Sequence, residues 1–526
     1  MGTSNLKYFN NRFQGSLSVQ QCQALEALIQ LRENDGCIPD IVHSIYQLTD
    51  ETIEWLIDYY AQTGMMPTEE YAKPLGTLEG YQTISVASMY YVGNGILGDS
   101  VGLGKTVEVC GLFNLLKREA KDHDFRFLVL TEKKSAPQVR SELIKFTGEY
   151  VDLLRNAEQR HIKKFLENHP CDYELDCSIT STHSLMKCPA FVSWMQMYTD
   201  GFDHPPFDIL VVDESSVVGG STSGYTESLR AIMKFFKRII FLNATPVESN
   251  VSVFYTQLDL LDKTYLPTKA NFKKEYYVMK YGGMYARETG KYKNTDKFKE
   301  LIKYRYFAST RRSIGAEMSG CSGGIIRSDL SPCQKKLLKE VTMHRMVYDC
   351  PCMLDSSIPF DEENVPKLGS LRGLLEDECA DALSVLLFVY YKESQRYMSE
   401  WLHKMGYSNR VLNGETSPKD SDAIIGGFKN GEYKVLITNV QKALNFGNCD
   451  YCIFYSIEPN PSKMVQFEGR MTRSLDVIGK HVYILSSRGK EYNMLNTVVR
   501  SRATAMRDMT EVDYSVVLSV LLGGEY

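Results

Sequence analysis

The stretch "GDSVGLGKTVEV", Gly98 to Val109, decides how the first half of the chain is interpreted. It follows the apolar segment "YYVGNGIL" and precedes "TVEVCGLFNLLKR", whose apolar residues have helical spacing. A glycine-containing loop between a strand and a helix lets backbone N–H groups approach phosphates at the positive end of the helix dipole. The strict G-x-x-x-x-G-K-T pattern fails, because Asp99 replaces its first glycine. The stretch therefore predicts a phosphate-binding loop in an α/β domain.

Each residue of the loop has an expected task in binding a nucleotide. The backbone of Gly102, Leu103 and Gly104 would surround the phosphates, and Lys105 would reach the β- and γ-phosphates. Thr106 would hold Mg²⁺ through its hydroxyl. The alternative is an ordinary glycine turn followed by a surface lysine. The position of Lys-Thr at the start of a helix favours the nucleotide interpretation, with ATP and Mg²⁺ as cofactors.

A second motif, "FDILVVDESS", ends an apolar strand in Asp213 and Glu214. Hydrolysis of a metal-bound phosphoryl group uses two acids, because one carboxylate binds the metal while the other stands beside the attacking water. We assign Asp213 to Mg²⁺ and Glu214 to the water. An Asp-Glu pair could instead cap the next helix. Its place after the phosphate loop, at about three βα units, favours the catalytic interpretation.

Two further motifs complete the candidate site. "FLNATPVESN" ends another strand, and Thr245 within it could sense the γ-phosphate and couple it to a neighbouring lobe. Far downstream, "QFEGRMTRS" carries Arg470 and Arg473, which helical spacing would place on one face. An arginine from a second lobe can stabilise the transition state of phosphoryl transfer. On its own, such a pair is more commonly a solvated helix face.

The pattern of apolar and polar residues divides the 526 residues into several segments. Short apolar strands alternate with helical stretches before Pro246 and again after about residue 376, which favours two parallel-sheet α/β units. The intervening Lys/Tyr-rich stretch looks helical. The predicted domains are a helical N-terminal module (1–75), a first lobe (76–250), a helical insertion and linker (251–375), a second lobe (376–500) and a C-terminal tail packed on it (501–526).

The net charge of the chain is unevenly distributed along the sequence. The first sixty residues hold eight acidic and three basic residues, so they carry the whole net charge of −5 and the remainder is neutral. A neutral remainder can still form a basic groove for nucleic acid, whereas the acidic module is a poor phosphate-backbone surface.

The thirteen cysteines are scattered, and the single C-x-x-C, Cys449 to Cys452, predicts reduced thiols and no structural metal. Without an apolar spanning run or a secretory signal, we expect an intracellular protein.

Taken in order, the motifs resemble those of superfamily II helicases, and among them the Swi/Snf-type (chromatin-remodeller-like) ATPases. "LEGYQTISVASMYYVGNGILGDSVGLGKT" resembles the Q motif and motif I, "VLTEKKSAPQVRSEL" motif Ia, and "ITSTHSL" motif Ib. "VVDESS" and "NATP" correspond to motifs II and III, "TNVQKALNF" to motif V, and "QFEGRMTR" to the Q-x-x-G-R-x-x-R of motif VI. The resemblance covers residues 76–490 and implies two RecA-like lobes with ATP in the cleft between them.

The resemblance also implies roles for individual residues. Gln82 takes the adenine-reading place, and Thr245 and Gln466 couple the nucleotide to motion. Ser216 departs from the usual His or Asp at the end of motif II, and motif V lacks its usual glycines. By motif position, the candidate nucleic-acid contacts are Lys133, Lys134, Gln138, Ser181 and Thr438.

The leading hypothesis is an ATPase that translocates on or unwinds double-stranded DNA. An RNA or branched-DNA helicase remains an alternative, as does an ATP-switched adaptor that binds a protein partner through the acidic N-terminal module. The compact chain suggests a bacterial or viral motor acting in the cytoplasm, with a nuclear location left open.

Overall fold

The computed structural model describes residues 78–523 with interruptions, and the predicted helical module at 1–75 lies outside the described residues. The described part has gaps at 79, 121–124, 133–134, 154–176, 182–188, 203, 219–222, 246–250, 265, 283–284, 304, 312, 441–445, 448, 473–475 and 511–514. The chain divides into two compact units, which we describe separately: unit 1 (residues 1–315 and 509–512) and unit 2 (residues 316–508 and 513–526).

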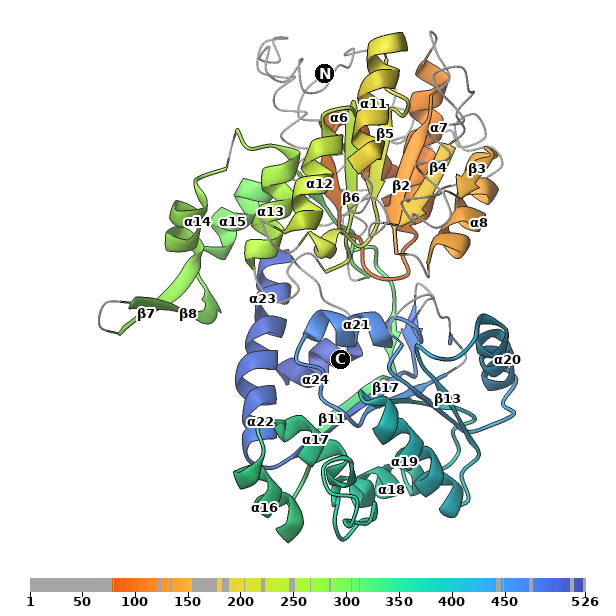
Figure 1. Cartoon of the computed structure of the whole chain (residues 1–526), viewed down its shortest axis with the longest axis vertical. Helices are drawn as coiled ribbons and strands as arrows, with labels where there is room; N and C mark the ends of the chain where they lie inside the picture. Colours follow the sequence, from red (N-terminus) through yellow and green to blue (C-terminus); the bar gives the residue numbers. More distant parts are fainter. Residues whose placement is uncertain are drawn as a thin grey trace. The chain divides into compact units, whose positions relative to one another are not determined.

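Unit 1 contains a seven-stranded parallel sheet in the order β3-β4-β2-β5-β6-β1-β9 (Figure 1). The apolar runs recognised in the sequence form its central strands, which are buried because helices cover both faces. The strands are β1 (Gly95–Leu97), β2 (Phe127–Thr131), β3 (Val151–Leu153), β4 (Cys177–Ser181), β5 (Ile209–Val212), β6 (Arg238–Leu242) and β9 (Tyr306–Phe307).

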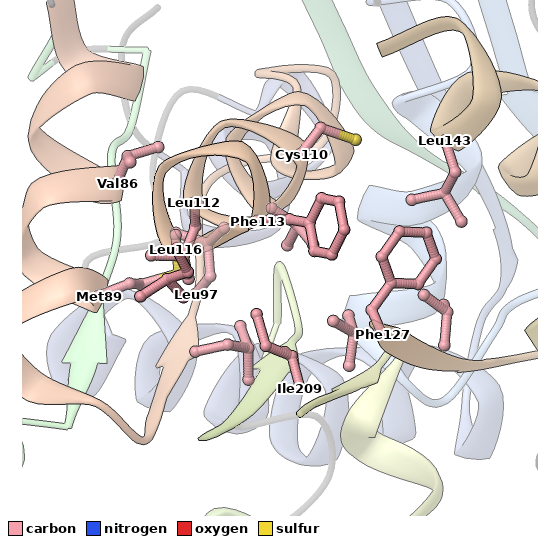
Figure 2. Packing of buried hydrophobic residues seen from close by; sticks show 14 of the residues in the cluster. Val86, Met89, Leu97, Cys110, Leu112, Phe113, Leu116, Phe127, Leu143 and Ile209 are labelled. Carbon is pink, nitrogen blue, oxygen red and sulfur yellow. The ribbon is translucent and has the colours of Figure 1, made fainter. Parts of the chain in front are cut away.

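The helices of this unit alternate with the strands along the chain. They are α6 (Gly80–Val92), α7 (Lys105–Glu119), α8 (Ala136–Thr147), α11 (Pro189–Phe202), α12 (Gly224–Met233) and α13 (Val251–Leu261). Figure 2 shows how α7 packs on the sheet, with Phe113 against Phe127 in an edge-to-face contact of 4.8 Å between ring centroids. This contact fixes the helix whose first turn follows the phosphate loop.

The segment predicted to be a helical insertion, residues 251–375, is only partly helical, because it also contains β-strands. Helices α14 (Lys269–Tyr276) and α15 (Thr295–Ile302) flank a two-stranded antiparallel ribbon, β7 (Tyr277–Gly282) and β8 (Tyr285–Tyr292). The same region also contains β9, which joins the sheet of unit 1, and β11, which joins that of unit 2. Several tyrosines and the pair Gly282-Gly283 in the sequence favour a ribbon over a helix at this place.

Unit 2 contains a six-stranded parallel sheet in the order β11-β17-β15-β12-β14-β13. Its strands are β11 (Ser322–Ser328), β12 (Val385–Phe388), β13 (Asn409–Leu412), β14 (Val435–Thr438), β15 (Tyr451–Phe454) and β17 (His481–Ser487), with a small pair β10 (Met318–Ser319) and β16 (Val477–Ile478) beside it. The fold class predicted from the sequence, two parallel-sheet α/β lobes, is therefore confirmed.

The helices of unit 2 bury the two faces of this sheet. They are α16 (Pro332–Glu340), α17 (His344–Asp349), α18 (Lys367–Glu376), α19 (Lys392–Lys404), α20 (Pro418–Lys429), α21 (Pro461–Glu468), α22 (Lys490–Met494), most of α23 (Arg500–Thr510) and α24 (Val516–Leu522). The C-terminal helix α24 is joined to α21, because the buried carboxylate of Glu468 accepts the backbone N–H groups of Val516 and Val517 at 2.7 and 3.2 Å. A carboxylate at a helix N-terminus also complements the helix dipole.

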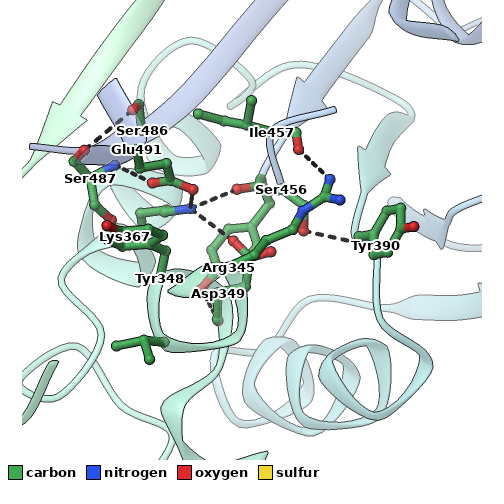
Figure 3. Close-up of polar contacts among 12 residues, drawn as sticks. Arg345, Tyr348, Asp349, Lys367, Tyr390, Ser456, Ile457, Ser486, Ser487 and Glu491 are labelled. Atoms are coloured by element: carbon green, nitrogen blue, oxygen red, sulfur yellow. Dashed lines mark hydrogen bonds and ion pairs between the residues drawn. The ribbon is translucent and has the colours of Figure 1, made fainter. Parts of the chain in front are cut away.

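A buried ionic network holds α17, α18 and α22 together in unit 2 (Figure 3). The amine of Lys367 donates to Asp349 Oδ1 at 2.9 Å, to Glu491 Oε1 at 3.0 Å and to the Tyr455 carbonyl at 3.1 Å. All three charged side chains are almost fully shielded from solvent. All three donor positions of the amine are used, so the cluster is closed to a further acceptor, although Asp349 Oδ2 accepts no hydrogen bond among the described residues.

The sequence also led to predictions about the cysteines and about membrane-spanning segments. The cysteines whose placement is described are free thiols, and Cys449 and Cys452 are buried at the start of β15. Among the described residues, no helix is both long and apolar enough to cross a membrane.

Candidate nucleotide-binding site

The loop before α7 has the backbone geometry of an anion-binding turn. Gly102 and Gly104 have φ angles of 92° and 91°, in the left-handed region that favours glycine. Gly104 is the N-cap of α7, and Lys105 and Thr106 form the first positions of that helix. A Cβ at Gly104 would lie 2.5 Å from the amide nitrogen of Gln82. The loop therefore needs glycine at this point, and it brings the unpaired N–H groups of a helix start to one place.

Lys105 lies in the middle of a cluster of carboxylates. Its amine donates to the backbone carbonyls of Asp99 at 2.5 Å and Ser100 at 3.3 Å. Burial lowers the pKa of Lys105, and this effect is opposed by four nearby carboxylates: Asp99, Glu214, Glu108 and Asp213. The fold thus brings the phosphate loop and the Asp-Glu motif, more than a hundred residues apart in sequence, within electrostatic reach of one another.

Behind the loop, Asp99 and Glu108 form a buried carboxyl pair. Both side chains are fully buried, and Asp99 Oδ1 accepts the backbone N–H of Ser309 at 2.7 Å. Burial raises the pKa of Asp99 to about 6, although hydrogen bonding to Glu108 lowers it. Burial and the neighbouring Asp99 raise the pKa of Glu108 well above its usual range. The two neighbouring buried carboxyls therefore make it unfavourable for both to carry a negative charge at once.

The Asp-Glu motif follows β5 with both carboxylates partly exposed. Asp213 Oδ2 accepts a hydrogen bond of 2.7 Å from the hydroxyl of Thr131, which ends the neighbouring strand β2. Glu214 has a φ of 50°, an unfavourable backbone conformation for a residue with a side chain. Ser215, the next residue, is buried and donates to Gln257 Oε1 on α13 at 2.8 Å. The surrounding contacts therefore hold the two acids in a strained turn.

Thr245 lies after β6, next to the strand that leads into the phosphate loop. The backbone N–H of Asn243 donates to the Leu97 carbonyl at 3.0 Å, and the N–H of Thr245 donates to Asn243 Oδ1 at 3.0 Å. The Thr245 side chain is fully buried, and its hydroxyl has no hydrogen-bond partner among the described residues. The turn that contains Thr245 is thus packed beside the start of the glycine loop and is not exposed on the surface.

Two side chains from α6 and one from the segment after β9 also bind the phosphate loop. Gln82 Nε2 and the Tyr81 hydroxyl both donate to the Leu103 carbonyl, at 3.0 and 2.9 Å. Arg311, which is 4% exposed, donates to the Val101 carbonyl at 2.9 Å. Sequence reasoning identified Gln82 but not Arg311, because no spacing rule connects a residue after β9 with a loop two hundred residues earlier.

In unit 2, the arginine motif does not form the helix face that spacing predicts. Helix α21 ends at Glu468, and Arg470 lies in the turn that follows. The Arg470 carbonyl accepts the N–H of Phe446 at 2.7 Å instead of a helical amide, and its side chain is 8% exposed. Gln466 is buried on α21, whereas Arg473 lies outside the described residues.

The candidate nucleic-acid contacts have mixed surroundings. Lys133 and Lys134, and the side chain of Ser181 at the end of β4, lie outside the described part of the structure. Gln138 is exposed on α8 and donates to Glu142 at 3.0 Å. Thr438 ends β14, where its buried hydroxyl accepts the N–H of Val440 at 3.0 Å. In the structure this hydroxyl therefore stabilises a strand end.

Comparison with known protein families agrees with the arrangement of the motifs. Residues 21–358 match the SNF2-related domain, and residues 366–474 match the helicase conserved C-terminal domain. The chain belongs to the SNF2-related family. The predicted resemblance to Swi/Snf-type proteins is confirmed, and the pair of domains is that of an ATP-dependent helicase-type enzyme.

Individual relatives of this SNF2-related chain are distant. An uncharacterized ATP-dependent helicase of Bacillus subtilis, YqhH, is 21% identical over 75% of this chain and 72% of its own length. The chromodomain-helicase-DNA-binding protein 1-like of Danio rerio is 21% identical over 79% of this chain, which spans only 41% of that relative. Among solved structures, the SWI2/SNF2 ATPase core of Sulfolobus solfataricus in complex with dsDNA aligns at 16% identity with a TM-score of 0.38, covering 85% of this chain and 97% of that one.

Proposed function

We propose that this chain is a DNA-stimulated ATPase that moves along double-stranded DNA. The observation that carries the proposal is the glycine loop at the start of α7, whose Lys105 amine lies within electrostatic reach of the partly exposed Asp213 and Glu214. Two partly exposed acids beside an anion-binding loop suit a phosphate group that arrives with a divalent cation. Membership of the SNF2-related family and the names of its relatives support DNA as the polymer.

The donors present fit a magnesium-bound nucleoside triphosphate. The N–H groups at the start of α7 and the Lys105 amine would bind the phosphates, and Thr106 and Asp213 would hold Mg²⁺. The metal would neutralise charge on the phosphates when bound. Glu214 would accept the proton of the attacking water, and Gln82 would contact the base. Arg470 and Arg473 would stabilise the negative charge that develops on the transferred group.

ATP turnover measured with different polymers separates this proposal from its alternatives. The full chain would be assayed alone, with duplex DNA, with single-stranded DNA and with RNA, beside Lys105→Ala as the inactive control. We expect stimulation by duplex DNA. Stimulation by RNA alone would favour an RNA helicase, and a rate unaffected by every polymer would favour an ATP-switched adaptor.

Translocation and strand separation require a second assay. Displacement of a third strand from a DNA triplex reports movement along a duplex, whereas release of a labelled strand from a forked duplex reports unwinding. We expect ATP-dependent triplex displacement. ATP turnover that duplex DNA stimulates without triplex displacement would contradict movement along the duplex.

The role of Arg470 has its own test. Arg470→Ala is expected to lower turnover by roughly 10³–10⁵-fold while ATP binding is largely retained, because the arginine would act on the transition state. Arg410→Ala is a suitable control, since Arg410 is exposed on the edge strand β13. Turnover that survives in Arg470→Ala would remove this residue from the mechanism.

A further inference from the structure

The segment 269–303 of unit 1, here called the basic ribbon, concentrates positive charge. It comprises α14, β7, β8 and α15, and holds ten Lys and Arg residues against four Asp and Glu residues, a net charge of +6. The whole chain has a net charge of −5. A surplus of this size within 35 residues is not needed for solubility, and it creates a local field that attracts polyanions.

The base of the ribbon is anchored by aromatic packing. Phe272 contacts Tyr276 at 4.8 Å between ring centroids, Tyr276 contacts Phe298 at 5.4 Å, and Tyr277 contacts Tyr292 at 5.1 Å. Phe272 and Phe298 are also buried against the rest of the unit through Tyr255 and Phe254. A two-stranded ribbon is only marginally stable by itself, so this packing fixes its base.

Beyond this base, β7 and β8 stand away from the sheet of unit 1 (Figure 1). Their register pairs Lys280 with Arg287 across the strands. The register therefore brings two cationic positions of the chain to the same level of the two strands.

Exposed lysines at the base of the ribbon add to its positive charge. Lys274 in the last turn of α14 and Lys291 and Lys293 at the end of β8 are exposed. They lie near each other, because the N–H of Lys293 donates to the Tyr276 carbonyl at 2.9 Å. The nearby carboxylate of Glu275 is held by Lys297 at 2.7 Å, and that of Glu300 by Lys303 at 2.7 Å. Two of the four acidic side chains of the segment are thus engaged by its own lysines.

We propose that the basic ribbon binds the phosphate backbone of double-stranded DNA, as a contact additional to those of the helicase motifs. The inference rests on the proposed function, since it gives the same polymer a second point of attachment. Lysines and arginines on a projecting, anchored ribbon suit contacts with phosphate oxygens that carry no sequence preference. The ribbon would then increase the affinity for double-stranded DNA without changing the chemistry at the phosphate loop.

The test neutralises four charges of the ribbon in the full-length chain. Lys280→Gln, Arg287→Gln, Lys291→Gln and Lys293→Gln are combined, and affinity for a labelled duplex is measured by fluorescence anisotropy across a range of salt concentrations. The matched control combines four exposed lysines of unit 2: Lys335→Gln, Lys336→Gln, Lys339→Gln and Lys404→Gln. Lys280→Arg, Lys291→Arg and Lys293→Arg together keep the charge and test whether the ribbon tolerates substitution.

Binding by the ribbon variant is expected to weaken by about 10-fold or more near physiological salt, and its salt dependence to fall by roughly 0.9 for each phosphate that the ribbon no longer neutralises. The arginine variant should bind like the wild type, and ATP turnover without DNA should be unchanged in all of them. An equally weakened unit 2 control, or wild-type affinity in the ribbon variant, would overturn the inference. If the wild type itself binds no duplex, the proposed function fails first. Weaker binding to anionic vesicles alone, with duplex affinity unchanged, would replace DNA by a membrane surface.

Discussion

Each lobe holds a lysine near carboxylates, and the two clusters are built in opposite ways. Lys367 in unit 2 donates to two carboxylates and one carbonyl at 2.9–3.1 Å, and all its charged partners are shielded from solvent. Lys105 in unit 1 donates only to carbonyls of its own loop, while four carboxylates surround it without an ion pair among the contacts of the described residues.

The pKa values of the two lysines move in opposite directions. The pKa of Lys367 is raised, because the attraction of Asp349 and Glu491 outweighs the effect of burial. The pKa of Lys105 is lowered, because burial outweighs the attraction of the more distant carboxylates. The Lys367 cluster pairs its amine directly with two carboxylates and serves stability. The Lys105 amine makes no direct ion pair with the carboxylates within its electrostatic reach, which suits a ligand that brings both phosphates and a cation.

Replacing Lys105 should have the largest effect on activity. Lys105→Ala is expected to lower ATP turnover by at least roughly 10²–10³-fold, as for the loss of one essential electrostatic contact to a transition state. The free energy of unfolding should change less than in Lys367→Met, because Lys105 stays partly exposed. Steady-state turnover and chemical denaturation of the same protein measure both effects. Turnover close to wild type would show that the Lys105 cluster is not the catalytic one.

Replacing Lys367 should mainly affect stability. Lys367→Met leaves two carboxylates buried without their cation, which is expected to cost about 3–5 kcal/mol in the free energy of unfolding. Since the folded pKa of Lys367 lies above its unfolded value, the stabilisation is present at neutral pH and lost at alkaline pH, as the amine deprotonates.

The control for this variant is Lys392→Met, which removes an exposed ion pair with Glu415. A change below about 1 kcal/mol is expected there. Denaturant unfolding compares the two variants. Equal losses in both would show that the Lys367 cluster contributes no more than a surface pair.

Arg311 should have a smaller effect on the loop. Arg311→Leu removes the donor to the Val101 carbonyl, and a hydrogen bond from a charged group contributes about 1.5–3 kcal/mol. We expect the KM for ATP to rise by about 10-fold, with Arg311→Lys between this variant and the wild type. Steady-state kinetics against ATP concentration measure the change. A lowered kcat at unchanged KM would instead indicate a role in the chemical step.

The smallest effect is expected from Glu108→Gln, which keeps a polar side chain of the same size beside Asp99 but removes an ionisable group. The folded pKa of Glu108 is raised, so the wild type loses stability as pH rises through that value, whereas the variant does not. Near neutral pH the two should differ by less than about 1 kcal/mol.

Thermal melting across neutral and alkaline pH detects this difference. The exposed Glu227→Gln on α12 serves as the control. Parallel pH profiles for Glu108→Gln and the wild type would show that the pKa of Glu108 is not raised in the folded protein.

Local patterns were sufficient to predict the backbone of two segments of the candidate site. The glycines before Lys105, and the Asp-Glu pair at the end of an apolar strand, were predicted from their flanking sequence, because a strand–loop–helix turn is specified by neighbouring residues. The helix expected to carry Arg470 ended two residues too early, at Glu468, since a backbone hydrogen bond to the distant Phe446 sets the turn. The ribbon after Tyr276 was also interpreted as helical, because Lys- and Tyr-rich segments give weak periodicity.

By itself, the sequence determined the two-lobe α/β class, the strand–loop–helix turn that leads into Lys105 and the order of the motifs, because these depend on short-range periodicity and composition. Only the tertiary structure decided that Glu108 faces Asp99, that Arg311 reaches the loop, and that Lys367 is closed into a buried network while Lys105 is left open. These pairings depend on which strands and helices become neighbours, and a residue's own flanking sequence does not encode what lies across a sheet. The charge environment of a buried group is therefore a property of the folded topology.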